Sequence, residues 1–310
     1  MVEKISGKAS PATILFGEYF AELGGPIVGF PAQEFVEVKV EKKKELEDIE
    51  IDNQITKEKF VKAEGKDKVE SKIFDEVFGC ELDVPKKGLK LSISGTATQK
   101  TPGYLFALSA AMEKAINQLS ITAWKTDNLF ECLHRAEKAI GKDEIKVHSA
   151  CASYDSLILV EDPKSEAKPR ALKAGKALFF VLAKTVPKVA AEEMKKKLAE
   201  KFKANDKNVL NAISDLKKIV SKSKNEFKFG GNQELGKLMN QSQALLSQLG
   251  LSWPEADQVM KISTYDGSFG AKISGYDGDV IILCENEKHQ DKIIGTLIAK
   301  NFKAIKIKFS

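Results

Sequence analysis

Between residues 89 and 119, the spacing of apolar residues changes from every second residue to the spacing that is typical of a helix. This change constrains the fold most. Leu89, Leu91 and Ile93 alternate with polar residues, which predicts a half-buried strand. Apolar residues then recur at helical spacing over residues 108–119, which predicts a helix. The loop between them, TATQKTPG, is rich in Thr and Gly. A strand, such a loop and a helix in this order bring backbone N–H groups and a helix N-terminus together, which is a natural anion site.

The remainder of the chain predicts further strands and helices in two domains. Residues 12–40 indicate two strands about a Gly-Gly turn, residues 41–72 a surface excursion of a strand plus loops, and residues 127–140 a helix. The C-terminal half interleaves the strands ALFFVLA, DVIILCE and AIKIKF with helices expected near residues 188–204, 207–222, 233–249, 254–266 and after Glu287. This order predicts an α+β fold whose C-terminal half is an α/β sandwich. The Pro- and Lys-rich stretch EDPKSEAKPRALKAGK indicates a boundary between domains of residues 1–165 and 166–310.

Composition and charge exclude several classes of protein. Hydrophobic residues make up 43% of the 310 residues and charged residues 30%, which is typical of a soluble globular protein. The net charge of +5 is mild and the lysines stand beside glutamates, so the charge helps to attract an anionic substrate but predicts no nucleic acid partner; a homodimer is left open. Because no apolar run of membrane-span or signal-peptide length occurs, we expect a cytoplasmic protein without a membrane partner. The cysteines form no C-x-x-C pair, which predicts reduced thiols and no structural metal site.

Three longer stretches are similar to one family. ASPATILFGEYFAELGGPIVGFPAQ resembles the opening of the mevalonate kinase branch of the GHMP kinase superfamily, and AEKAIGK with ASYD resembles its Ala-Glu helix and Ser-Gly-Ile-Asp motif. ELGKLMNQSQALLSQLGLSWPEADQVMKISTYDGSFGAKISGYDG resembles its long C-terminal signature. The resemblance implies a two-domain GHMP kinase fold, with an N-terminal domain like ribosomal protein S5 domain 2 and a ferredoxin-like C-terminal domain. It also implies an ATP- and Mg²⁺-dependent kinase that phosphorylates a hydroxyl of mevalonate or a related acid in isoprenoid-precursor synthesis.

The resemblance implies roles for single residues. Asp155 falls on the catalytic aspartate, and phosphoryl transfer to an alcohol needs a carboxylate near the acceptor hydroxyl; its other interpretation is a cap on a turn before the strand SLILV. Glu137 falls on the Mg²⁺ ligand, with a solvated helix glutamate as the alternative. Glu18 and Tyr19 would face the acceptor, although an acid at a strand end also commonly pairs with Lys or Arg. The implied nucleotide-binding residues are Gly95, Thr96, Thr98, Lys100, Thr101 and Gly103 in the first loop and Ser274 and Gly275 in the last, with Thr101 also on Mg²⁺.

Several departures from the family pattern keep alternatives open. The lysine expected near Ala12 is missing, Tyr19 replaces a histidine, and the glycine run of the last motif has become SGYDGD. One alternative is a degenerate GHMP-fold protein without kinase activity that binds or regulates. Another is a decarboxylase-like relative, which the string SAC before Ala152 favours. A third is a phosphomevalonate-type relative, a kinase for a related acceptor. Asp277 either faces Mg²⁺ and substrate or closes the site. Cys151 is interpreted as a small buried residue rather than a nucleophile.

Overall fold

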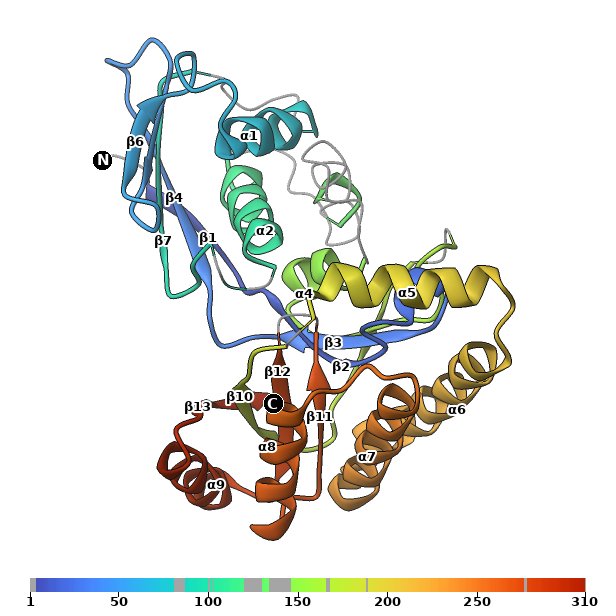
Figure 1. The fold of residues 1–310 in the computed structure, drawn as a ribbon. Coiled ribbons are helices and arrows are strands. Elements are labelled where there is room, and N and C mark those ends of the chain that lie inside the picture. Colours follow the sequence, from blue (N-terminus) through green and yellow to red (C-terminus); the bar gives the residue numbers. More distant parts are fainter. Residues whose placement is uncertain are drawn as a thin grey trace. The chain divides into compact units, whose positions relative to one another are not determined.

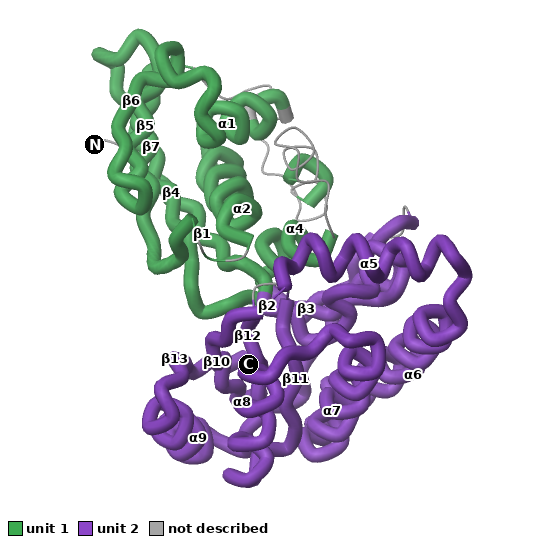
Figure 2. The backbone as a smooth tube through the Cα atoms, in the orientation of Figure 1, with its two compact units in different colours: residues 1–12, 31–155 green, residues 13–30, 156–310 purple. Residues whose placement is uncertain are grey.

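The structure, a computed structural model, forms two compact units. Unit 1 comprises residues 1–12 and 31–155, and unit 2 comprises residues 13–30 and 156–310 (Figure 2). The sequence-based division at residue 165 differs from this grouping and stays a prediction. In the described residues, no helix is both long and apolar enough to cross a membrane. The structure describes residues 4–80, 87–99, 101, 103–119, 130–133, 146–165, 168–187, 189–275 and 278–309.

Unit 1 is built on a five-stranded sheet with helices α1 and α2 on one face (Figure 1). Strand β4 pairs antiparallel with β1 and β7, and β7 pairs in parallel with β5. In sheet order, the strands are β1 (Lys4–Ala9), β4 (Val36–Lys42), β7 (Leu89–Gly95), β5 (Ile49–Asn53) and β6 (Glu58–Val61). The helices whose bounds lie within the described part of unit 1 are α1 (Val69–Cys80), α2 (Tyr104–Asn117) and α4 (Val147–Tyr154).

The core of unit 1 lies between this sheet and α2. Alternate residues of β4 and β7 are buried there, so both predicted strands are confirmed, as is the helix that follows the Thr-rich loop. Gly7 of β1 allows the strand to lie close to α2, because a Cβ atom there would lie 2.1 Å from the backbone oxygen of Ala111 in α2.

Two expectations for unit 1 are corrected. Residues 41–72 hold β5, β6 and the start of α1 rather than a single strand with loops, because Ile49 and Ile51 pair with β7 and enter the core. The segment expected to form a turn before SLILV is helix α4, in which Val147, Ala150 and Cys151 are among the buried residues, and Asp155 caps its C-terminal end. The helix expected over residues 127–140 falls mostly outside the described residues, and residues 130–133 are helical.

The described residues of unit 2 form two four-stranded sheets packed with five α-helices (Figure 1). The first sheet has the order β11 (Gly270–Ser274), β12 (Asp279–Cys284), β10 (Leu178–Lys184) and β13 (Lys303–Phe309). The second has the order β2 (Ala12–Phe16), β3 (Ile27–Pro31), β8 (Leu157–Val160) and β9 (Arg170–Leu172), with the short 3-10 helix η1 (Ala21–Leu23) between β2 and β3. The helices are α5 (Ala191–Lys203), α6 (Lys207–Phe229), α7 (Asn232–Gln248), α8 (Pro254–Tyr265) and α9 (Glu287–Ala299).

Both sheets and the helices of unit 2 contribute to one hydrophobic cluster. The strands and helices predicted for the C-terminal half are confirmed, and α6 continues to Phe229 because Phe227 extends its buried stripe. The α+β class is confirmed as well.

The cysteines divide into two states. Cys151 and Cys284 are buried free thiols, whereas Cys132 is disulfide-bonded. The expectation of reduced thiols is therefore wrong for Cys132, because tertiary proximity, which sequence spacing does not reveal, decides which cysteines pair.

Candidate active site

The Thr-rich loop joins β7 to α2 as predicted, and its first backbone groups are already hydrogen-bonded. The amides of Thr96 and Ala97 both donate to the backbone oxygen of Phe35, at 3.0 and 3.1 Å. Thr96 also accepts, through Oγ1, the amide of Phe35 at 3.2 Å. Gly95, with φ +147°, lies against the same residue. The start of the loop is therefore fastened to the segment before β4 through amides that a phosphate cradle would need free.

The second half of the loop forms a closed turn in front of α2. The amide of Thr98 donates to Oγ1 of Thr101 at 2.9 Å, and the amide of Thr101 donates to the Thr98 oxygen at 2.8 Å. Gly103 precedes α2 in the left-handed region (φ +76°), and no side-chain hydrogen bond caps the helix. The N-terminus of α2 thus carries the positive end of a helix dipole, which favours an anion. Lys100 lies outside the described residues.

Helix α4 places an imidazole beside the start of α2 and a carboxylate at its own C-terminal end. The ring of His148 stacks on Phe106 of α2, with centroids 5.0 Å apart, and Nδ1 lies 3.0 Å from the position of a Cβ on Gly103. Asp155 directly follows α4 with its side chain exposed and its backbone in the left-handed region (φ 49°, ψ 46°). Its amide donates to the Cys151 oxygen at 2.9 Å. Asp155 therefore ends a helix, and it presents a solvent-accessible carboxylate.

The charge of Asp155 acts on two neighbouring side chains. Burial lowers the pKa of Lys114 in α2, and the negative charges of Asp155 and Glu113 oppose that shift. Lys114 Nζ donates to the Lys8 oxygen at 3.3 Å. Burial, reinforced by Asp155, raises the pKa of the Cys151 thiol well above its ordinary value. A thiol held protonated in this way is a poor nucleophile, so the geometry agrees with a small buried cysteine.

The sequence did not predict that Lys114 interacts with Asp155, nor that His148 lies beside Gly103. Lys114 reads as one more solvated helix lysine, and His148 is too far from Gly103 along the chain for any local pattern to join them. A signal existed for Lys114 alone, since it follows Glu113 inside an otherwise apolar helix. Glu137 lies outside the described residues, and among those described no cluster of three His, Cys, Asp or Glu could hold a metal ion.

In unit 2, the two residues predicted to face the acceptor are buried. Glu18 is 1% exposed and accepts a hydrogen bond from Lys272 Nζ at 2.5 Å, and the lysine is 0% exposed. Lys272 also donates to the oxygen of Ile273. Burial raises the pKa of Glu18 and lowers that of Lys272, and their mutual attraction opposes both shifts. Tyr19 is 2% exposed. The interpretation of Glu18 as a strand-end acid paired with lysine describes this geometry.

The last loop begins beside the same strand. Ser274 ends β11, and its Oγ donates to the Ile14 oxygen in β2 at 2.6 Å. Gly275 has φ +66° and open space where a Cβ would stand. Asp277 lies outside the described residues, whereas Asp279 accepts from Lys184 Nζ at 2.7 Å. Ser274 and Gly275 thus adjoin β2, the strand that leads to Glu18, whereas Asp279 is held by β10.

The predicted residues therefore fall into two groups. Unit 1 carries the loop residues and Asp155, and unit 2 carries the acceptor-side residues and the last loop. The first group combines a helix N-terminus, hydroxyls and an exposed carboxylate, which suits binding of an anion and abstraction or orientation of a proton.

Comparison with known proteins places these observations in a family context. No protein-family model matches the chain. Mevalonate kinase of Methanothermobacter thermautotrophicus is 24% identical over 177 residues, which span 57% of this chain and 57% of that protein. The match thus covers little more than half the length of that relative.

Solved structures match over much more of the chain. L. major mevalonate kinase in complex with R-mevalonate has a TM-score of 0.81 at 20% identity and covers 97% of this chain and 95% of its own. Methanococcus jannaschii mevalonate kinase has a TM-score of 0.78 at 19% identity, with coverage of 99% and 97%. Streptococcus pneumoniae phosphomevalonate kinase with phosphomevalonate and AMPPNP has a TM-score of 0.76 at 13% identity, with full coverage of both chains. The chain therefore has the GHMP kinase fold, and its resemblance to that superfamily, and most of all to mevalonate kinase, is confirmed.

Proposed function

We propose that this protein is an ATP- and Mg²⁺-dependent kinase that transfers the γ-phosphoryl group to a hydroxyl of mevalonate or a related small acid, in cytoplasmic isoprenoid-precursor synthesis. The observation that carries the proposal is the match in fold, over nearly the whole of both chains, to a mevalonate kinase bound to R-mevalonate. The separate sequence match to a mevalonate kinase supports the same acceptor.

In this proposal, unit 1 supplies the nucleotide and catalytic groups. The exposed carboxylate of Asp155 accepts or orients the proton of the acceptor hydroxyl. The loop from Gly95 to Gly103, including Lys100, holds phosphate with the N-terminus of α2. Thr101 and Glu137 are the proposed Mg²⁺ ligands, and the ion, when bound, supplies charge neutralisation at the phosphates.

Unit 2 supplies the remaining contacts. Ser274 and Gly275 are proposed at the nucleotide, and Glu18 with Tyr19 on the acceptor side. Because Glu18 is buried and bonded to Lys272, its contribution is to fix the segment around Tyr19 rather than to exchange a proton.

One observation favours a second candidate, a GHMP-fold protein that binds or regulates without transferring phosphate. The backbone amides of Thr96, Ala97 and Thr98 all donate hydrogen bonds to other groups of the protein. A kinase that holds phosphate through these amides must break some of these bonds when nucleotide binds, whereas a binding module keeps them.

A coupled assay of ADP formation separates the candidates. Mevalonate, its phosphates, homoserine and galactose are offered with ATP or GTP. Turnover of mevalonate supports the proposal, and turnover of a phosphomevalonate alone identifies the phosphomevalonate-type alternative. Asp155→Asn is expected to reduce turnover by about 10²- to 10⁴-fold. Asp215→Asn, which alters an exposed ion pair on α6, is the matched control and leaves turnover unchanged.

Calorimetry supplies the result that would reject the kinase. If MgATP and MgADP show no heat of binding at millimolar concentration and no acceptor yields ADP, the second candidate stands.

A further inference from the structure

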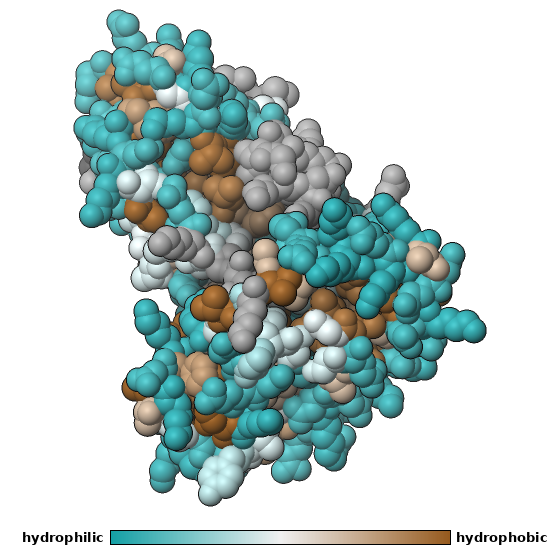
Figure 3. Space-filling model, in the orientation of Figure 1, coloured by the Kyte–Doolittle hydropathy of each residue, from teal (hydrophilic) through white to brown (hydrophobic). Residues whose placement is uncertain are grey.

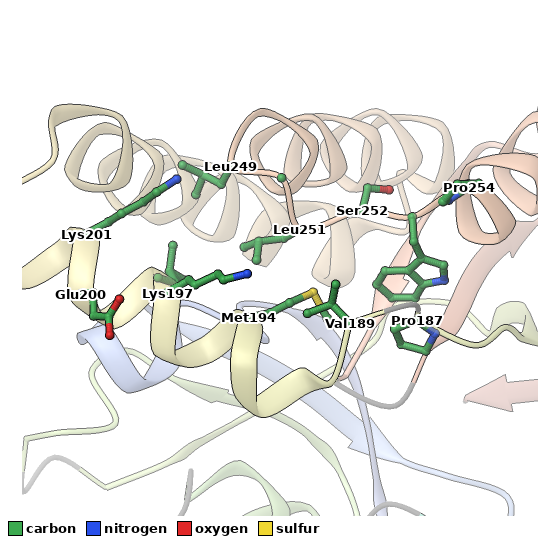
Figure 4. A pocket seen from close by; sticks show the side chains of 13 residues that line it. Pro187, Val189, Met194, Lys197, Glu200, Lys201, Leu249, Leu251, Ser252 and Pro254 are labelled. Atoms are coloured by element: carbon green, nitrogen blue, oxygen red, sulfur yellow. The ribbon is translucent and has the colours of Figure 1, made fainter.

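We propose that a pocket in unit 2, between α5 and the loop that joins α7 to α8, binds an anion carrying an aliphatic chain. The pocket has a volume of about 450 Å³, which is within the range of small-molecule sites (Figure 4). None of the residues predicted for phosphoryl transfer lines it, so this second site does not rest on the proposed function.

The wall of the pocket is apolar and preformed. Met194 and Leu198 of α5 face Leu251 and Trp253 of the loop, and each of the four is at most 7% exposed. The indole Nε1 of Trp253 donates to Oγ1 of Thr185 at 2.9 Å, which fixes the ring. A wall that is already packed and oriented loses little entropy when a ligand enters, and aliphatic carbon gains most from such a surface.

Two ammonium groups stand over this wall. Lys197 and Lys201, one helical turn apart on α5, extend toward the loop residues Leu249 and Leu251 (Figure 4). Lys201 forms no ion pair with any residue that the structure describes. The pair between Lys197 and Glu193 is exposed on both sides, and such a pair exchanges readily for another anion.

These charges decide the class of ligand. The loop from Leu249 to Pro254 carries no charged residue, and Glu200 is the single acid among the described lining residues. Hydrophilic side chains cover α5 on the face that Figure 3 shows, and the charged ones among the described lining residues are Lys197, Lys201 and Glu200. A ligand with a carboxylate or phosphate head and an alkyl tail can bind both the lysine ammonium groups and the apolar wall, whereas a neutral apolar molecule can bind only the wall.

Calorimetry with alkyl anions of increasing length tests the proposal. Hexanoate, octanoate and decanoate are expected to bind progressively tighter, by about fourfold for each added CH₂ group. Decyl phosphate against decanoate distinguishes the two head groups, and octyl glucoside, with a neutral head, is expected to bind more weakly than octanoate. When decanoate is added to the Trp124→Phe variant, in which Trp253 is the remaining tryptophan, the tryptophan fluorescence emission is expected to change. Absence of binding, or affinity independent of tail length, would overturn the proposal.

Matched variants assign the site. Replacing Lys197 and Lys201 together by Glu is expected to lower the affinity for decanoate by about tenfold or more. Lys196→Glu makes the same charge change on an exposed residue of α5 that does not line the pocket, and it is expected to have little effect. Val189→Glu puts a charge on the partly exposed wall and is expected to abolish binding. Equal weakening by Lys196→Glu and the double variant would refute the assignment.

Two further results would also overturn it. Displacement of decanoate by mevalonate would make the pocket the acceptor site rather than a second one. Conversion of a dimer to a monomer by Val189→Glu, measured by analytical ultracentrifugation, would mean that a second copy of the chain covers the pocket.

Discussion

Lys272 is the residue whose environment departs most from what its chemistry favours. Its side chain is fully buried, and the partners of its ammonium group among the described residues are Glu18 and the Ile273 oxygen. Taking two charges out of water is costly, and their attraction repays that cost only while both partners are present. The pair also joins two segments that lie 254 residues apart, the turn after β2 and strand β11.

Removing the lysine alone is therefore expected to be severe. Lys272→Met leaves the Glu18 carboxylate buried without its cation, and should lower the free energy of unfolding by about 3–5 kcal/mol. Urea denaturation followed by circular dichroism measures this change. Lys218→Met, which breaks an exposed pair with Asp215, is the control and should cost less than about 1 kcal/mol.

A double variant tests the cause. Lys272→Met combined with Glu18→Gln removes the isolated charge and should recover much of the lost stability. If the double variant is as unstable as the single one, packing of the lysine stem, and not the stranded carboxylate, explains the loss.

The same single variant should become pH-dependent. Burial already raises the pKa of Glu18 above its ordinary value of 4.5. Without Lys272 the largest opposing contribution is lost, and the backbone hydrogen bonds at Gly17 and Glu18 are left to oppose the shift. Between the ordinary and the raised pKa, the folded variant holds a proton that the unfolded chain has released, so its stability falls as pH rises. The deficit of Lys272→Met relative to the wild type should be smaller at pH 5 than at pH 8. Urea titrations at both pH values measure it, and an equal deficit would contradict the assignment to Glu18.

How far the site could be predicted differs from residue to residue. Because Glu18 stands between apolar residues, the sequence indicates that its carboxylate needs a partner. The sequence does not show that this partner is Lys272, because the two residues meet only in the tertiary fold. The strand–loop–helix order located the loop before α2, yet it could not reveal that Thr96 and Ala97 spend their amides on Phe35. The roles of Asp155 and of the loop residues stay predictions.

At the scale of elements, the contact between β1 and α2 depends on one residue without a side chain. Gly7→Ala would place a Cβ 2.1 Å from the Ala111 oxygen and 2.4 Å from the Ala115 nitrogen, both in the helix backbone. Neither atom can turn away as a side chain could, so the variant should lose about 1–3 kcal/mol or more. Gly295→Ala is the matched control: it lies inside α9 with open space around it and should gain about 0.5–1 kcal/mol. Thermal unfolding of both variants measures the contrast, and a stable Gly7→Ala would show that α2 can move away from β1.

Periodicity determined which elements could be predicted. Strands buried on one face, such as β4 and β7, alternate cleanly, and the amphipathic helices α6 and α7 carry clear apolar stripes. Strand β11 is buried at every residue, including Lys272, so it shows no alternation and was not predicted. Helix α4 is short and rich in small residues, which also suit a turn.

At the scale of the whole molecule, unit 2 is assembled from two separated pieces of chain. Ile27 of β3 pairs with Val160 of β8, and residues 13–30 place Leu15, Phe16 and Phe30 in the same hydrophobic cluster as the C-terminal strands. A boundary drawn from a Pro- and Lys-rich stretch can mark where the chain is exposed. Such a boundary cannot show that an earlier segment of the chain pairs with a later one, because strand pairing over this sequence separation does not change the local composition.

This arrangement predicts that residues 156–310 do not suffice for a folded unit 2. Without residues 13–30, the fully buried strand β8 loses its β3 partner, and Lys272 loses Glu18. The fragment 156–310 should therefore bind the dye ANS and unfold in urea without a sharp transition. Because Gly29 lies opposite Ile158 in an antiparallel pair, the end of β3 adjoins the start of β8, and a two-residue Asn-Gly turn can join residues 13–31 directly to residue 156. The fused protein should unfold cooperatively and bind little ANS, and if the fragment alone unfolds as sharply as the fusion, the N-terminal segment is not needed to form the core of unit 2.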